Sequence, residues 1–332
     1  WQDGKSIDSR DIQINFSDVI IERPDLRTII FKLQTPFSPF PAILSKPIFK
    51  KGFLGTGVWK VKKVTIVGNV VEKIILSRLK ENNIIYKFYP TEETAKNALK
   101  LGEIDKLNDI FSFQPFDSWK TVSVSKKIDY KKFAAVFFNL AKDKKTADKT
   151  LRQALTYAIK KDKFSENRAL GPISPYSWAY NPQVKPYEYD LTKAKEMMKE
   201  LSKETLNNLS LNIATTHVLL PQAEEIAKNW RDLGILVYVQ VISAIPDDFD
   251  AFLGILDIPK DPDQYSLWHS SQEATNISNY KNPRIDKLLE DGRTITNEIE
   301  RKKIYFDFQR FLIEDSPTAF LYHPVSYTIT RK

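Results

Sequence analysis

The chain has 332 residues, of which 42% are hydrophobic and 28% charged, and its net charge is +8. These proportions are typical of a soluble globular protein and exclude a disordered tail, a collagen and a membrane-embedded protein. The absence of cysteine excludes disulfides, thiolate zinc sites and a cysteine nucleophile. Because the lysines are spread along the chain instead of clustered, the charge predicts a solvated surface and no nucleic-acid partner.

At roughly 150 residues per domain, the length predicts about two domains. In the first half of the chain, runs rich in Val, Ile, Phe and Tyr predict strands at 28–33, 58–67, 71–76, 84–89 and 133–138. Between the last two strands, Thr91 can cap a helix that carries Glu92 and Glu93 in its first turn and ends at Gly102. The charged segment 142–149 lacks large apolar residues, so we expect a linker there.

Apolar stripes in the second half predict helices near 151–159, 191–201, 221–233 and 297–312. Further strands are predicted at 209–214, 235–242, 249–256 and 318–330. The strand, helix and strand within 209–242 have the pattern of a βαβ unit. This alternation indicates an α/β protein with open sheets.

The sequence offers few groups for metal or cofactor chemistry. His217, His269 and His323 are far apart in the chain, and no Walker loop, GxGxxG, GxSxG or HExxH motif occurs. We therefore expect no metal and no cofactor.

Three acids, Asp257, Asp261 and Asp263, follow the predicted strand 249–256. In open α/β sheets the carboxyl ends of strands form the ligand-binding edge, so these acids are candidates for a binding site. An acidic turn is the alternative, because Asp-Pro is good turn chemistry. Aromatic residues at 176–180 and 265–268, in irregular stretches beside proline, are either core residues or the wall of a binding site.

Several segments occur in the order found in one protein family. They are WQDGK at 1–5, TIIFKLQTPFSPF at 28–40, GTGVWK at 55–60, YPTEETAKNALKLGEID at 89–105, VFFN at 136–139, LRQALTYAIK at 151–160, DLTKAKEMM at 190–198, DPD at 261–263, NYKNPRID at 279–286 and LYHPVSY at 321–327. Taken together, they make the chain resemble the extracellular solute-binding proteins of dipeptide, oligopeptide and nickel ABC importers, the bacterial solute-binding protein family 5.

This resemblance implies an α/β fold of the periplasmic-binding-protein-like type II class. Two lobes would close on a hinge like a venus flytrap, and the accessory domain would be reduced or missing. The expected division is 1–53 as a remnant of the accessory region, 54–160 as lobe I, 161–318 as lobe II and 319–332 as a strand returning to lobe I. The chain opens at Trp1, so we expect a trimmed chain without its targeting segment.

The resemblance also implies a function without catalysis. The chain would be the monomeric substrate-binding subunit of an ABC importer, capturing a peptide-like solute between its lobes and delivering it to a membrane permease. We expect a lipid-anchored extracellular or a periplasmic location. Two alternatives stay open: the ligand-sensing domain of a regulator, and a hydrolase that uses Asp257, Asp261 and Asp263.

The family's amine-binding acid corresponds to Asp257. The backbone of the preceding residues would pair with an extended ligand, as in strand addition. Two departures concern this strand: many members have Trp where this chain has Gly254, and some have Arg near Ala251. The expected ligand-binding residues are Gly254, Ile255, Leu256, Asp257, Trp178, Trp268 and Asn279. Peptides, metal chelates and oligosaccharides all remain open as ligands.

Overall fold

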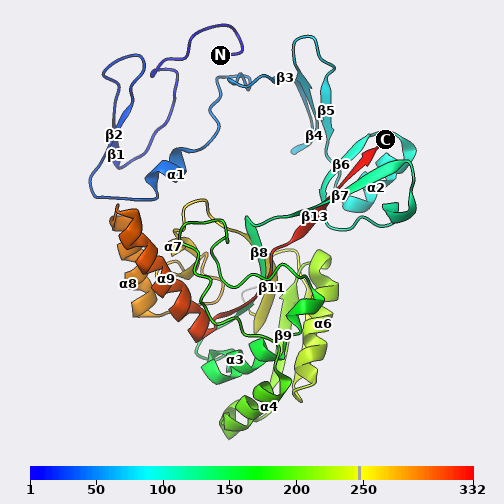
Figure 1. Cartoon of the computed structure of the whole chain (residues 1–332), viewed down its shortest axis with the longest axis vertical. Coiled ribbons are helices and arrows are strands. Elements are labelled where there is room, and N and C mark those ends of the chain that lie inside the picture. Colours follow the sequence, from blue (N-terminus) through cyan, green and yellow to red (C-terminus); the bar gives the residue numbers. More distant parts are fainter. Residues whose placement is uncertain (246–247) are drawn as a thin grey trace. The chain divides into compact units, whose positions relative to one another are not determined.

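The computed structural model describes residues 1–245 and 248–332 and divides the chain into two compact units (Figure 1). Unit 1 comprises Trp1–Pro36, Phe40–Lys127 and Ser326–Lys332, and unit 2 comprises Phe37–Pro39 and Ile128–Val325. Within the described residues, no helix combines the length and apolar character that a membrane crossing requires. Each unit has its own hydrophobic core.

Unit 1 contains small sheets with the strand orders β1-β2, β3-β4-β5 and β6-β13-β7. Their strands are β1 (Val19–Glu22), β2 (Ile30–Leu33), β3 (Lys60–Val67), β4 (Val70–Ser77), β5 (Ile84–Lys87), β6 (Lys106–Ile110), β7 (Val122–Ile128) and β13 (Val325–Arg331). The helical segments are α1 (Phe40–Leu44), α2 (Glu92–Leu101) and η1 (Phe116–Ser118). The core of the unit is formed by Leu99, Leu107, Ile110, Phe116, Val122 and Ile329.

The ends of α2 follow directly from the sequence. The Thr91 hydroxyl accepts a hydrogen bond from the Thr94 amide, and the Thr91 amide donates to the Thr94 hydroxyl, which makes a reciprocal capping box. Gly102 ends the helix in the left-handed conformation, with φ of 79°, that glycine adopts without strain. The predicted helix is confirmed at both ends.

Unit 2 is built on one five-stranded sheet with the order β10-β9-β11-β8-β12. The strands are β8 (Lys132–Phe138), β9 (Ser210–Thr215), β10 (Leu236–Val241), β11 (Ala251–Asp257) and β12 (Thr318–Tyr322). Strands β9 and β10 are parallel and flank α6 (Leu220–Arg231) in the chain, so the predicted βαβ unit is confirmed. The inner strand β8, between β11 and β12, is apolar from Phe133 to Phe138 and fully buried there, as a strand covered on both faces requires.

Helices cover both faces of this sheet (Figure 1). Phe138 of β8 stacks on Trp230 of α6, and its neighbour Phe137 stacks on Trp268 of α7 (Tyr265–Trp268). Because successive strand residues point to opposite faces, α6 and α7 lie on opposite sides. The remaining helical segments are η2 (Lys145–Ala147), α3 (Lys149–Ala158), η3 (Lys161–Lys163), α4 (Leu191–Glu200), α5 (Lys203–Leu206), η4 (His217–Leu219), α7 (Tyr265–Trp268), α8 (Pro283–Thr294) and α9 (Glu298–Asp315).

The observed chain organisation differs from the expected one in three places. The predicted strand 318–330 is two strands, because β12 pairs with β8 in unit 2 whereas β13 pairs with β6 in unit 1. Apart from the short segment Phe37–Pro39, the chain passes from unit 1 to unit 2 at 127–128 and returns at 325–326, whereas lobe boundaries were expected at 160–161 and 318–319. The expected linker 142–149 lies inside unit 2, where Thr146 is fully buried.

Lys161, at the start of η3, is a titratable side chain buried in unit 2. Only 1% of its surface is exposed, and its Nζ donates to the carbonyl oxygens of Thr156 and Tyr187, at 2.5 and 2.7 Å. Burial, reinforced by the positive charge of Arg168, lowers the pKa of Lys161 to about 7, and the negative charge of Glu188 opposes this shift.

This buried lysine predicts a pH-dependent stability. The ordinary pKa of the side chain is 10.5, so between about 7 and 10.5 the unfolded state binds a proton that the folded state releases. The burial of Lys161 therefore lowers the free energy of unfolding by its full amount below about pH 7. This destabilisation decreases as the pH rises toward 10.5. Urea unfolding of the wild type and Lys161→Met at about pH 6.5 and about pH 9.5 should show the wild type gaining several kcal/mol relative to the variant.

The control for this experiment is Lys163→Met, because the Lys163 side chain is half exposed and pairs with Glu225 at the surface. We expect this variant to track the wild type across the same pH range. A stability difference between the wild type and Lys161→Met that stays constant with pH would show that Lys161 does not titrate in this range.

Candidate ligand-binding site

One edge of the unit 2 sheet gathers the carboxyl ends of four strands. Strands β9, β10 and β11 run parallel, and β12 runs in the same direction because both β11 and β12 pair antiparallel with β8. Their carboxyl ends therefore meet at the edge where β8 begins. In open α/β sheets this is the edge at which ligands bind.

Strand β11 extends beyond its neighbour β9 at this edge. The pairing with β9 ends at Leu253, opposite Thr215, whereas the pairing with β8 continues to Asp257, opposite Lys132. Among the residues that the structure describes, no strand lies against the other side of β11 from 254 to 257. Alternate backbone amides and carbonyls of an antiparallel strand point to this side. We call residues 254–257 the open edge of β11 because no strand pairs there; Gly254 is buried, Ile255 and Leu256 are half-buried, and Asp257 is exposed.

Asp257 ends the open edge, with its carboxylate in solvent. The side chain is 85% exposed, and its one described ionic partner is Lys132, whose Nζ lies 3.7 Å from Oδ1. The next residue is fixed by the backbone, because the Ile258 amide donates to the Lys131 carbonyl at 2.6 Å. The carboxylate of Asp257 is thus accessible to solvent, while hydrogen bonds hold the backbone beside it in place.

Aromatic side chains lie at the same edge. The ring of Tyr130, two residues before β8, meets the ring of Tyr176 edge-on, with centroids 5.0 Å apart. Tyr130 also packs at 5.0 Å against His323, which is buried after the end of β12. Burial lowers the pKa of His323, although its Nδ1 donates to the Lys132 carbonyl and this bond favours the charged form. No sequence motif singles out Tyr130, because its place at this edge depends on strand pairing.

The side chain of Phe252 leaves no room for a side chain at Gly254 in β11. A Cβ atom at position 254 would lie 2.5 Å from the Phe252 ring, which covers the glycine on the same face of the strand. The ring itself lies 6.3 Å from Phe137 and 6.5 Å from Phe249, measured between centroids. The Phe252 ring therefore fills the space that a side chain at position 254 would need.

This packing makes a prediction about Gly254→Ala. We expect the variant to lose about 1–3 kcal/mol of stability, because the Phe252 ring must leave its packed position. In a Phe252→Leu background the same substitution should cost less, since leucine lacks the ring atoms that clash. Urea unfolding of the four proteins in a double-mutant cycle measures this coupling. An equal cost in both backgrounds would contradict it.

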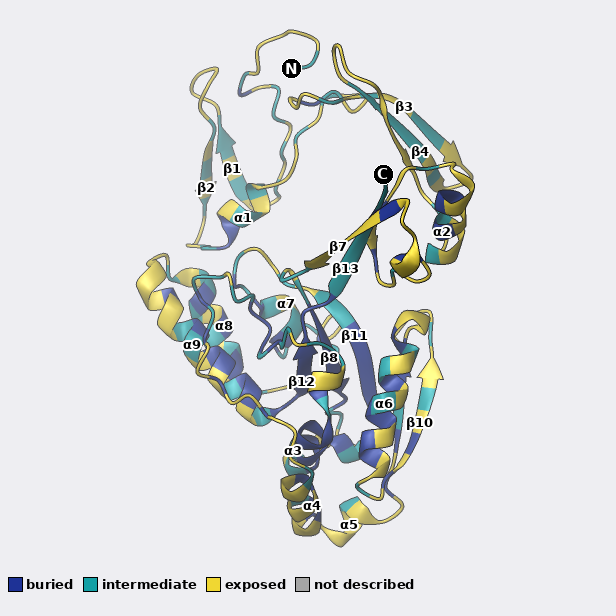
Figure 2. Cartoon of the chain, turned by 45° about the vertical axis from the view of Figure 1, so that its right-hand side comes forward, coloured by how far each residue is buried: buried dark blue, intermediate teal, exposed yellow. Residues whose placement is uncertain are grey.

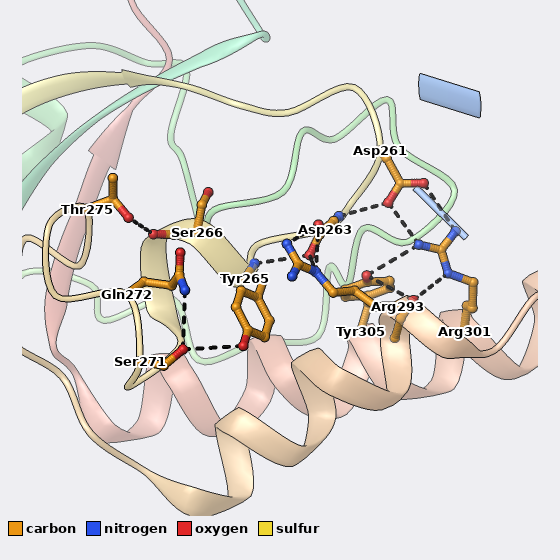
Figure 3. A network of polar contacts seen from close by, with 11 residues as sticks. Asp261, Asp263, Tyr265, Ser266, Ser271, Gln272, Thr275, Arg293, Arg301 and Tyr305 are labelled. Carbon is orange, nitrogen blue, oxygen red and sulfur yellow. Dashed lines mark hydrogen bonds and ion pairs between the residues drawn. The ribbon is translucent and has the colours of Figure 1, made fainter. Parts of the chain in front are cut away.

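Asp261 and Asp263 differ from Asp257 because arginines hold them (Figure 3). Arg301 donates to both oxygens of Asp261, at 2.8 and 3.2 Å, and Arg293 donates to both oxygens of Asp263, the shortest contact being 2.9 Å. The carboxylate of Asp261 also stabilises the loop, since it accepts a hydrogen bond from the Asp263 amide. Bidentate pairs of low exposure fix these two acids in a structural role, so the hydrolase alternative loses its acid–base partners for Asp257.

Among the expected aromatic residues, Trp178 lies beside this ionic network. Its half-buried ring is 5.4 Å from the Arg301 guanidinium and 6.2 Å from the Tyr305 ring. Trp268 is fully buried between Phe137 and Phe320, so it is a core residue.

Asn279 lies at the other end of β11. Its side-chain amide donates to the Oδ1 atom of Asn139, and the Asn139 amide donates to the Phe249 carbonyl just before β11. At about 3.3 Å per residue, the length of β11 puts roughly 20 Å between this group and Asp257. Of the expected ligand-binding residues, 254–257 thus lie at the carboxyl end of β11, whereas Trp178, Trp268 and Asn279 lie elsewhere in unit 2.

The histidines form no common site in the described part of the chain. His217 is exposed at the start of η4, His269 is stacked on Tyr265, and His323 lies beside Tyr130. Within the same residues, no group of three or more histidines or acids is arranged to hold a metal ion.

Comparison with known proteins identifies the family. Residues 1–276 match the model of the bacterial extracellular solute-binding proteins, family 5 Middle. The oligopeptide-binding protein AppA of Bacillus subtilis is 28% identical over 280 residues, which are 73% of this chain and 51% of that protein. The dipeptide-binding protein of Escherichia coli is 25% identical over 56% of this chain and 39% of its own length. The chain thus spans about half the length, or less, of these relatives.

Solved structures show the same fold. The structure of AppA from Bacillus subtilis in complex with a nonapeptide has a TM-score of 0.74 at 23% identity and covers 98% of this chain and 77% of its own. NikZ from Campylobacter jejuni in complex with Ni(L-His) has a TM-score of 0.79 at 23% identity, with 96% and 74% covered. The expected two-lobed periplasmic-binding-protein architecture is confirmed, and the chain belongs to the family 5 extracellular solute-binding proteins of bacteria.

Proposed function

We propose that this chain is the substrate-binding part of an ABC importer and that it captures a peptide-like solute without changing it chemically. The observation that carries this proposal is the open edge of β11. A peptide lying along 254–256 would pair with the outward backbone groups as an added strand, and main-chain hydrogen bonds would hold it whatever its sequence.

Asp257 sets the direction of the peptide in this proposal. The exposed carboxylate at the end of the strand would accept the peptide's amino terminus, in competition with Lys132 at 3.7 Å. Tyr130 and Tyr176, which expose aromatic surface at the same edge, would contact the first side chains. The names of the relatives support a peptide-like solute, since they include oligopeptide-binding and dipeptide-binding proteins.

The same proposal includes the partners and the location of the protein. The chain would act as a monomer and hand its solute to membrane permease subunits, from a lipid-anchored position on the cell surface or from the periplasm. Membership of a family of extracellular proteins supports this location.

Titration calorimetry with short peptides tests the function. Tri- and pentaalanine with free amino termini should bind, and the same peptides with acetylated amino termini should bind much more weakly, because acetylation removes the charge that Asp257 would receive. Native mass spectrometry of the freshly purified protein should show a bound peptide. If neither peptide binds while nickel–histidine does, the solute class proposed here is wrong.

A further inference from the structure

The β3–β4 hairpin of unit 1 ends in an exposed aliphatic tip. Val67 and Val70 face each other across the two-residue turn, and Ile66 is the next residue on β3. These three side chains are 60% to 68% exposed, which is coloured accordingly at the end of β3 in Figure 2. Gly68 in the turn has a φ of +60°, which favours glycine. The tip (Ile66, Val67 and Val70) is therefore a small apolar surface at the end of a tight hairpin.

Lysines surround the hairpin behind this tip. Lys60, Lys62 and Lys63 are exposed on β3, and Lys73 lies on β4, whereas Glu72 is the hairpin's one acid. None of the four lysines takes part in an ion pair within the described part of the chain. At about 3.3 Å per residue, Lys63 stands roughly 13 Å from Val67. Moving along the hairpin away from its turn, the apolar tip is thus followed by a group of four lysines, which we call the lysine band.

We propose that this tip inserts into the surface of a membrane that contains anionic phospholipids. Such a surface offers both matching environments at the required spacing: an apolar boundary for the tip and, just above it, phosphate groups for the lysines. A protein partner fits less well, because three side chains present far less area than the roughly 1,000 Å² that a specific protein interface buries. The inference concerns unit 1 and does not depend on the solute that the protein binds.

Co-sedimentation of the full chain with lipid vesicles tests this inference. The wild type should bind vesicles of phosphatidylcholine with phosphatidylglycerol at low salt, and bind weakly to phosphatidylcholine alone or at high salt. Ile66→Ser/Val67→Ser/Val70→Ser should reduce binding about tenfold or more, because it removes the aliphatic groups that enter the apolar layer. Lys62→Gln/Lys63→Gln/Lys73→Gln should lose the preference for phosphatidylglycerol.

The matched control is Leu236→Ser/Tyr238→Ser on β10, where both side chains are 63% exposed but no such lysine band is present. It should bind vesicles as the wild type does, and circular dichroism should show all variants folded. Equal binding by the tip variant, or no wild-type binding to anionic vesicles, would overturn the inference. Tip-dependent dimerisation without vesicle binding would also overturn it, in favour of a second copy as the partner.

Discussion

Replacing Arg152 by methionine is expected to lower the free energy of unfolding by about 3–5 kcal/mol, because it leaves several buried carbonyl oxygens without a donor. Arg152 lies on α3, is only 4% exposed, and burial lowers the pKa of its guanidinium. Its nitrogens donate at 2.7–2.9 Å to the carbonyl oxygens of Thr146, Ala147, Asp315 and Ser316. One side chain thus joins η2 to the carboxyl end of α9, where a cation also favours the helix dipole.

Urea unfolding of Arg152→Met measures this loss. Arg310→Met is the control, because Arg310 is an exposed residue of α9 that pairs with Asp307 one turn away, and we expect a change below about 1 kcal/mol. Arg152→Lys should fall between the two, since an ammonium keeps the charge but cannot reach all four oxygens. If Arg152→Met were as stable as Arg310→Met, the carbonyl contacts would carry no net stability.

Arg152 also illustrates what local sequence predicts. The apolar stripe beside it predicts α3, because helix periodicity is a property of neighbouring residues. The role of Arg152 depends on carbonyls more than 160 residues away, at the end of α9. For the same reason the sequence predicts the βαβ unit correctly and merges β12 with β13, whose partners belong to different units.

In the candidate site, too, the local sequence predicts the position of a residue but not its contacts with distant residues. The position of Asp257 after an apolar strand correctly predicts that it lies at the carboxyl end of β11. Asp261 and Asp263 have a similar local setting, and only Arg293 and Arg301, some 30 and 40 residues further on, distinguish their role from that of Asp257. The burial of Trp268 likewise depends on β8 and β12, so an aromatic in an irregular stretch cannot be assigned to core or site by its sequence alone.

Asp257→Asn is expected to weaken the binding of peptides with free amino termini by about tenfold or more, because asparagine keeps the shape of the side chain and removes its charge. Acetylated peptides lack the amino-terminal charge, so their weaker binding should be unchanged in the variant. Calorimetry of both peptides against both proteins separates the charge interaction from the backbone pairing along 254–256.

Asp248 provides a matched control, because it lies three residues before the opposite end of the same strand. Its side chain is 87% exposed and pairs with Lys144, as Asp257 is 85% exposed and pairs with Lys132. Asp248→Asn therefore changes the net charge by the same amount in a similar setting, and it should leave peptide affinity unaltered. A loss of affinity in both variants would indicate a general effect of charge, and a loss in neither would remove Asp257 from the site. Loss in Asp257→Asn alone would place the peptide's amino terminus at the carboxyl end of β11.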